Sequence, residues 1–279
     1  MPIHDQGYRR YQGTRRRRGQ AWLVIARSGI RAMFTRRAFI ALLLAAWVPF
    51  LVRAAQIYAV ANLPQLQVLA LTGETYRSFL GTQELFIFFV AVYAGAGLIA
   101  NDRRANALQI YLGKPLTRVE YIVGKLAVLC AFLLFVSWVP AMLLLAVQVL
   151  FTGSVAFVRD NIYLLPAITL FAGLECLTSA LAMLALSSLS RSSRYVAVLY
   201  AGLLFFTSAI AAVLRRVTGE DGLAWLSVTD SLSQVGNAIF RLPLRFDSPV
   251  WLCLLSLLVV IAAAVAILER RVRGVEVIA

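Results

Sequence analysis

The sequence predicts an all-α, polytopic membrane protein with six transmembrane helices. Hydrophobic residues make up 61% of its 279 positions and charged residues only 14%, about half of the usual share in a soluble domain. The mean hydropathy is +0.80, and the apolar residues fall in blocks of about 20, the length that crosses a bilayer. Because lipid offers no partner to backbone polar groups, these blocks must be helices. This composition excludes a disordered protein and argues strongly against an ordinary soluble globule.

The predicted spans follow from the apolar blocks in order along the chain. They cover roughly residues 38–60, 82–100, 123–148, 162–188, 195–214 and 249–268. Pro140 is expected to kink the third span. The three cysteines lie inside apolar blocks, which favours buried side chains over disulfides or a metal site. We therefore expect one transmembrane domain over 20–279, preceded by a disordered basic tail over 1–19.

The basic residues predict the orientation of the spans. Most of the 27 Lys and Arg residues lie before the first span, between the second and third spans, between the fourth and fifth spans, or after the last. Basic residues concentrate on the cytoplasmic side of membrane proteins, so both termini are expected there, an N-in/C-in topology. The net charge of +14 is thereby explained without nucleic acid as a partner.

Two segments outside the spans have the spacing of amphipathic helices. Residues 21–36 predict an interfacial helix on the cytoplasmic surface before the first span, and the alternative is the start of one long first helix. The predicted outer segment 215–248 contains a second such pattern from Trp225 to Ile239. That helix is either an outer gate or an element packed on the bundle.

Catalytic motifs do not appear in the chain. No phosphate-binding loop, nucleophile motif or metal-ligand cluster is present in the sequence, and His4 is the only histidine. We therefore expect no enzymatic activity and no bound metal. Charged groups inside spans are the default functional candidates, and Glu175 lies near the middle of the fourth. It either lines a translocation path or is a hydrogen-bonded structural residue, while Glu84 and Arg53 lie near the outer ends of their helices.

The cytoplasmic loop between the second and third spans carries the most specific pattern. Asp102 is placed to favour a helix start, and Leu108, Tyr111 and Leu112 form a short apolar stripe on a basic helix. Pro115 ends this helix, and Thr117 with Glu120 has the spacing of a capping box that opens the next one. Such a loop presents apolar side chains to a soluble partner.

This stretch resembles the signature of bacterial ATP-binding-cassette (ABC) type-2 exporter permeases. The positions that match in order are Gly97, Asp102, Leu108, Leu112, Pro115, Arg118, Gly124 and Lys125. Asn106-Ala107 replaces the usual Gly-Thr, and Gly29 stands where the family often has an acid. The six-helix layout and the long outer segment before the last span also fit the family.

The resemblance implies a permease subunit of the bacterial cytoplasmic membrane that moves an unidentified substrate, by export, with ATP hydrolysed elsewhere. Its partners would be an ABC ATP-binding subunit, which carries ATP and Mg²⁺, a second permease copy and membrane lipids. The segment 102–118 would be the coupling helix that sits in a groove of the ATPase. The residues implied for the helix and its anchors are Asp102, Arg103, Arg104, Leu108, Tyr111, Leu112, Pro115, Arg118, Gly124 and Lys125.

Three other classes are less consistent with the sequence. A secondary transporter or channel without an ATPase is disfavoured by the few intramembrane charges and the lack of an evident inverted repeat. A membrane enzyme lacks the required residues. A membrane scaffold would share the loop helix but would show no nucleotide-dependent movement.

Overall fold

A computed structural model describes residues 20–62, 72–106, 117–152, 159 and 161–272. Within these ranges the chain is helical and contains no strand. The predicted tail over 1–19 and the loop positions Leu108, Tyr111, Leu112 and Pro115 lie outside the described residues.

Six helices are long and apolar enough to cross a membrane, which confirms the number of predicted spans. They run over Arg37–Asn62, Gly73–Arg104, Arg118–Phe151, Leu164–Leu189, Ser193–Thr218 and Val250–Arg271. The second begins nine residues before its predicted start at 82. Thr72 and Thr75 form a capping box there, and the added turns bury Tyr76 and Phe79. Burial against neighbouring helices outweighs the polar residues that made this stretch read as a loop.

Two of the six helices are interrupted close to a proline. The first consists of α2 (Arg37–Ala46) and α3 (Val48–Asn62), which meet two residues before Pro49. The third consists of α7 (Arg118–Val136) and α8 (Trp138–Thr152), which meet three residues before Pro140, where a kink is predicted. Proline has no N–H, so a carbonyl one turn earlier loses its helical donor. Next to the first break, Gln83 donates its side-chain amide to the carbonyl of Ala46 at 3.1 Å.

The second span contains a wide turn. It consists of α4 (Gly73–Val90), a π-helical turn η2 (Ala91–Gly95) and α5 (Ala96–Arg104). Turns of this kind are rare and occur frequently at functional sites. Here the turn faces α10, and a Cβ on Gly95 would lie 2.5 Å from Cγ of Met183. The glycine therefore permits close contact between the two helices.

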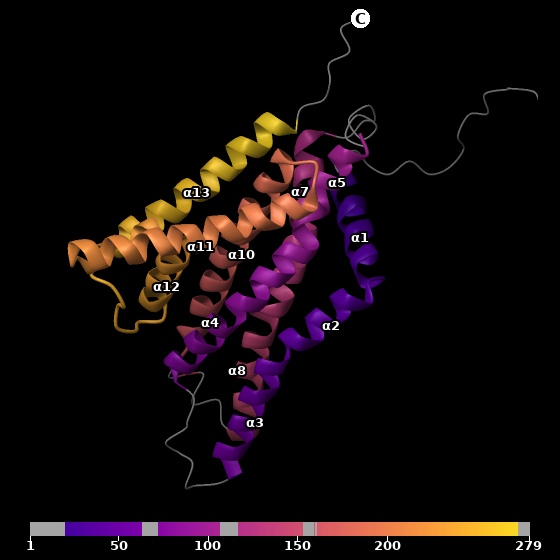
Figure 1. The fold of residues 1–279 in the computed structure, drawn as a ribbon. Coiled ribbons are helices and arrows are strands. Elements are labelled where there is room, and N and C mark those ends of the chain that lie inside the picture. The colour runs from indigo at the N-terminus through magenta and orange to yellow at the C-terminus, as the bar shows by residue number, and fades with distance from the viewer. Residues whose placement is uncertain (1–19, 63–71, 107–116, 153–158, 160, 273–279) are drawn as a thin grey trace, which may run out of the picture.

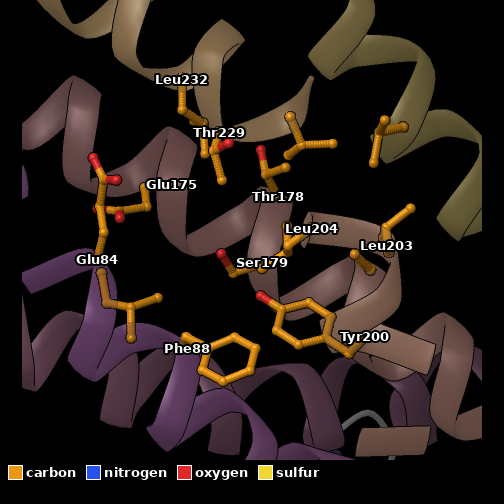
Figure 2. A pocket seen from close by; sticks show the side chains of 14 residues that line it. Glu84, Phe88, Glu175, Thr178, Ser179, Tyr200, Leu203, Leu204, Thr229 and Leu232 are labelled. Atoms are coloured by element: carbon orange, nitrogen blue, oxygen red, sulfur yellow. The ribbon is translucent and has the colours of Figure 1, made fainter. Parts of the chain in front are cut away.

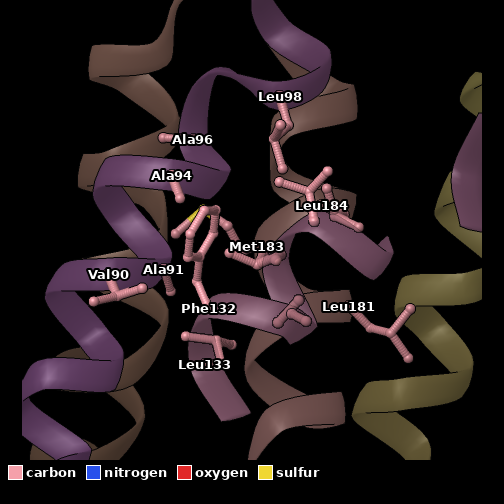
Figure 3. Packing of buried hydrophobic residues seen from close by; sticks show 14 of the residues in the cluster. Val90, Ala91, Ala94, Ala96, Leu98, Phe132, Leu133, Leu181, Met183 and Leu184 are labelled. Carbon is pink, nitrogen blue, oxygen red and sulfur yellow. The ribbon is translucent and has the colours of Figure 1, made fainter. Parts of the chain in front are cut away.

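Helix α10 (Leu164–Leu189) is the central element of the bundle (Figure 1). It packs against α4, α5, α7, α8, α11 (Ser193–Thr218) and α13 (Val250–Arg271). Figure 3 shows the core between α10, α7 and the second span, where small residues such as Ala91 and Ala94 face larger ones such as Phe132 and Met183. Small residues let membrane helices approach closely, and dispersion contacts then stabilise the bundle.

The two amphipathic segments also form helices. Helix α1 (Ala21–Phe34) is separated from α2 by Thr35 and Arg36, so it is not the first turns of one long span, and it packs along α7. Its position at a membrane surface remains a prediction. The outer segment forms a 3-10 turn η3 (Asp221–Leu226) and α12 (Val228–Ile239), which packs against α13, α11 and α10. In this conformation α12 is therefore an element packed on the bundle, the second of the two predicted alternatives.

Candidate functional site

One end of the bundle gathers positive charge. There α5 and α13 end, α7 begins and α10 turns into α11, as Figure 1 shows. We call this the basic end. Its described basic residues are Arg103, Arg104, Arg118, Lys125, Arg191, Arg194, Arg270 and Arg271. Segments far apart in the sequence thus place their basic residues at one end of the fold.

Asp102 lies at the centre of the basic end. Nζ of Lys125 is 2.7 Å from Oδ2 of Asp102, and the Tyr121 hydroxyl donates to the same oxygen at 2.7 Å. The ammonium also lies 5.5 Å from the centre of the Tyr121 ring. The side chains of Lys125 and Asp102 are only 13% and 19% exposed, so water competes weakly for these contacts. Two side chains of α7 therefore fix the end of α5.

The structure places Asp102 differently from the sequence-based expectation. Asp102, Arg103 and Arg104 form the last turn of α5 and do not open a separate helix. The Asp102 carboxylate is bound by Lys125 and Tyr121. The predicted helix over 102–118 is thus wrong at its beginning, and its apolar stripe falls outside the described residues.

The start of α7 agrees with the predicted capping box. Thr117 accepts from the backbone N–H of Glu120 at 3.2 Å, and the Glu120 carboxylate accepts from the backbone N–H of Thr117 at 3.0 Å. Arg118 is exposed in the first turn that follows. The cap fixes the direction in which the chain enters the third span.

Gly124 lets α1 lie directly on α7. A Cβ at this position would lie 2.9 Å from Cβ of Ile25 and 3.0 Å from the carbonyl oxygen of Trp22. Gly29 makes the reciprocal contact, because a Cβ there would lie 2.6 Å from Cγ2 of Val128. Beside this contact, a cavity of about 370 Å³ lies between α1, the second span and α7, next to Asp102. Helix α1 is thus part of the site that surrounds the Asp102–Lys125 pair.

A second set of contacts joins α5 to α10. The Ser187 hydroxyl accepts from the backbone N–H groups of Ile99 and Ala100 at 3.1 and 3.0 Å, and donates to the carbonyl of Ala96 at 2.9 Å. Arg103 donates to the carbonyl of Ser188. Sequence reasoning missed Ser187, since a serine in an apolar helix has no distinctive pattern. The helix ends that flank residues 107–116, α5 and α7, are therefore fixed to each other, and α5 is also fixed to the central helix α10.

Glu175 belongs to a different place in the molecule. It lies on α10 and is 2% exposed, and it lines a small chamber of about 50 Å³ together with Glu84 of the second span (Figure 2). Hydroxyl-bearing side chains on the chamber wall are Thr178, Ser179, Tyr200 and Thr229. The structure therefore separates Glu175 from the basic end and places it in a chamber inside the bundle whose wall is mostly apolar, with a few hydroxyl groups.

Arg77 connects this chamber to the opposite end of the bundle. Nη1 of Arg77 lies 3.5 Å from Oε1 of Glu84, and its guanidinium stacks 4.5 Å from the centre of the Phe171 ring. Arg77 also lines a cavity of about 410 Å³, which we call the outer cavity after the predicted topology. The sequence predicts a position outside the spans for Arg77, because the second predicted span begins at residue 82.

No family model matches this chain, and no curated protein matches it. Among the described residues, no group of three or more His, Cys, Asp or Glu side chains is arranged to hold a metal ion.

Proposed function

We propose that this chain is the transmembrane subunit of an ABC-type exporter, driven by ATP hydrolysis in a separate subunit. The basic end would face the cytoplasm, in accordance with the positive-inside rule. The loop over 107–116 would then be the contact with the ATPase. The proposal further includes a second permease copy in the complex and a bacterial cytoplasmic membrane as its location.

The observation that carries the proposal is that the two helix ends flanking this segment are held in place by specific contacts. Asp102 is bound by Lys125 and Tyr121 at one side of the loop, and Thr117 caps α7 at the other. Ser187 and Arg103 join the same region to α10. Because packed helices shift as units, a push on this loop would be transmitted to the central helix. A mere connection between two spans does not need such fixation.

The test is ATPase coupling in a reconstituted complex. The full chain is co-expressed with an ABC ATP-binding subunit from the same genome and placed in nanodiscs. Replacing Leu108 and Leu112 together with Ala is expected to abolish co-purification and stimulated ATP hydrolysis, because the apolar stripe is lost. Gln109→Ala, in the same loop but off the stripe, is the matched control. Unchanged co-purification of the double variant would contradict the proposal.

A secondary transporter or channel is the alternative, and the carboxylates inside the bundle favour it. Buried ionisable groups mark ion paths in carriers, and Glu175 and Glu84 share one chamber. Transport by the purified chain alone in liposomes, without nucleotide, would support this alternative against the ATP-driven one.

A further inference from the structure

The chamber inside the bundle contains an uncompensated carboxylate. Glu84 is paired with Arg77 at 3.5 Å, so these two charges balance. Glu175 adds a second carboxylate from α10, and its Oε2 is buried without a hydrogen-bond partner. Arg245 lines the outer cavity and is exposed, so its charge is screened by solvent. A buried charge without a partner is costly, so the Glu175 carboxyl group is either neutralised by a proton or paired with a bound cation.

The chamber wall offers oxygen atoms as ligands. Oγ1 of Thr178 donates to the carbonyl of Leu174 at 2.8 Å, so the lone pairs of this hydroxyl remain as acceptors. The Ser179, Tyr200 and Thr229 side chains face the same space (Figure 2). The rings of Phe88 and Tyr200 also line it and stack on each other, with their centres 5.8 Å apart. Carboxylate and hydroxyl oxygens together suit a small cation.

The size of the chamber restricts the ligand. About 50 Å³ accommodates roughly three or four water-sized groups, far less than the volume of a drug-sized pocket. With Glu175 ionised, the chamber has one net negative charge, which matches a monovalent ion, whereas Ca²⁺ requires six to eight oxygen ligands that usually include several carboxylates. The ligand is therefore small and singly charged.

We propose that Glu175 and the surrounding hydroxyls form a binding site for one monovalent cation, either an alkali ion or a primary ammonium group. Glu84 is the second wall of the site, and its pairing with Arg77 separates the chamber from the outer cavity. As a site for cargo or a coupling ion, it rests on the proposed transport function. Binding itself requires neither an ATPase nor transport.

The test is cation binding to the purified full chain in nanodiscs. NaCl, KCl and methylammonium chloride are titrated separately at constant ionic strength, with N-methylglucamine chloride as the replaced salt. Calorimetry and the melting temperature are the two readouts, since a ligand that binds only the folded state raises the latter. We expect saturable binding of at least one of the three cations, and which of them binds distinguishes an alkali ion from an ammonium group.

Variants separate specific binding from a general salt effect. Glu175→Gln keeps the shape and should weaken binding at least about tenfold, whereas Glu269→Gln, an exposed carboxylate on α13, should leave it unchanged. If Glu175→Gln does not fold, Ser179→Ala removes one hydroxyl ligand and should weaken binding by a smaller factor. No saturable binding, equal binding by Glu175→Gln, or a response to protons alone would overturn the proposal. Because no ATPase is present, a failure here is distinct from a failure of the coupling test.

Discussion

Replacing Gly124 with alanine should displace α1 from α7. The new Cβ would lie 2.9 Å from Cβ of Ile25, 3.0 Å from its Cγ2 and 3.0 Å from the carbonyl oxygen of Trp22. Carbon atoms in contact normally lie about 3.5–4.0 Å apart, so α1 must move by roughly 0.5–1 Å. Two of the three close atoms belong to the backbone or to a Cβ and cannot rotate away. Overpacking of this kind costs about 1–3 kcal/mol of unfolding free energy.

The assay is equilibrium unfolding in mixed micelles, followed by tryptophan fluorescence and by protease cleavage within α1. Gly202→Ala on α11 is the matched control, because no atom lies within 4 Å of its added Cβ. That control should be neutral or slightly stabilising, since alanine favours helix over glycine by about 0.5–1 kcal/mol. In the Gly124→Ala background, Ile25→Ala should restore part of the loss, because it removes Cγ2 but leaves the other two close atoms.

Equal stability of Gly124→Ala and Gly202→Ala would refute the reasoning. It would mean that α1 does not lie against α7 at this distance. Accelerated cleavage of α1 in the Gly124 variant alone would support the packing described here.

Three further changes test other contacts. Asp102→Asn and Lys125→Gln should each destabilise the fold. Their double-mutant cycle should give a coupling free energy of about 1–3 kcal/mol, as expected for a charge-assisted, largely buried pair, and additive effects would contradict this pair. Ser187→Ala should lower the free energy of unfolding by about 1–3 kcal/mol and speed hydrogen exchange at the N–H groups of Ile99 and Ala100, because these groups lose their acceptor. Unchanged exchange rates would exclude these hydrogen bonds. Gly236→Ala places a Cβ 2.7 Å from Nε of Arg77 and should lower the melting temperature more than Gly173→Ala, which meets nothing within 4 Å; equal melting temperatures would argue against this contact.

The sequence predicted the parts of the fold that depend on local composition. Six apolar blocks give six helices, and the Thr117–Glu120 spacing gives the expected cap. The break near Pro140 follows from a missing N–H. In each case the cause lies within a few residues along the chain.

The missed features depend on contacts between distant segments. Arg77 reads as a loop residue until α10 and α12 surround it with Phe171 and Gly236. Ser187 gains its role only because α5 lies beside α10. The sequence singled out Asp102, Gly124 and Lys125 through a resemblance, but the reason that they lie together, with α1 packed on α7, is visible only in three dimensions.

The extra residue in the turn Ala91–Gly95 divides the second span into two halves with different angular registers. One residue corresponds to about 100° around a helix axis. A protein shortened by one residue within this turn would regain a continuous helix, and the far half would rotate by that angle. Asp102 would then point away from Lys125, while Glu84 kept its place. A single inserted residue therefore sets the orientation of the Asp102–Lys125 pair relative to the chamber that contains Glu84.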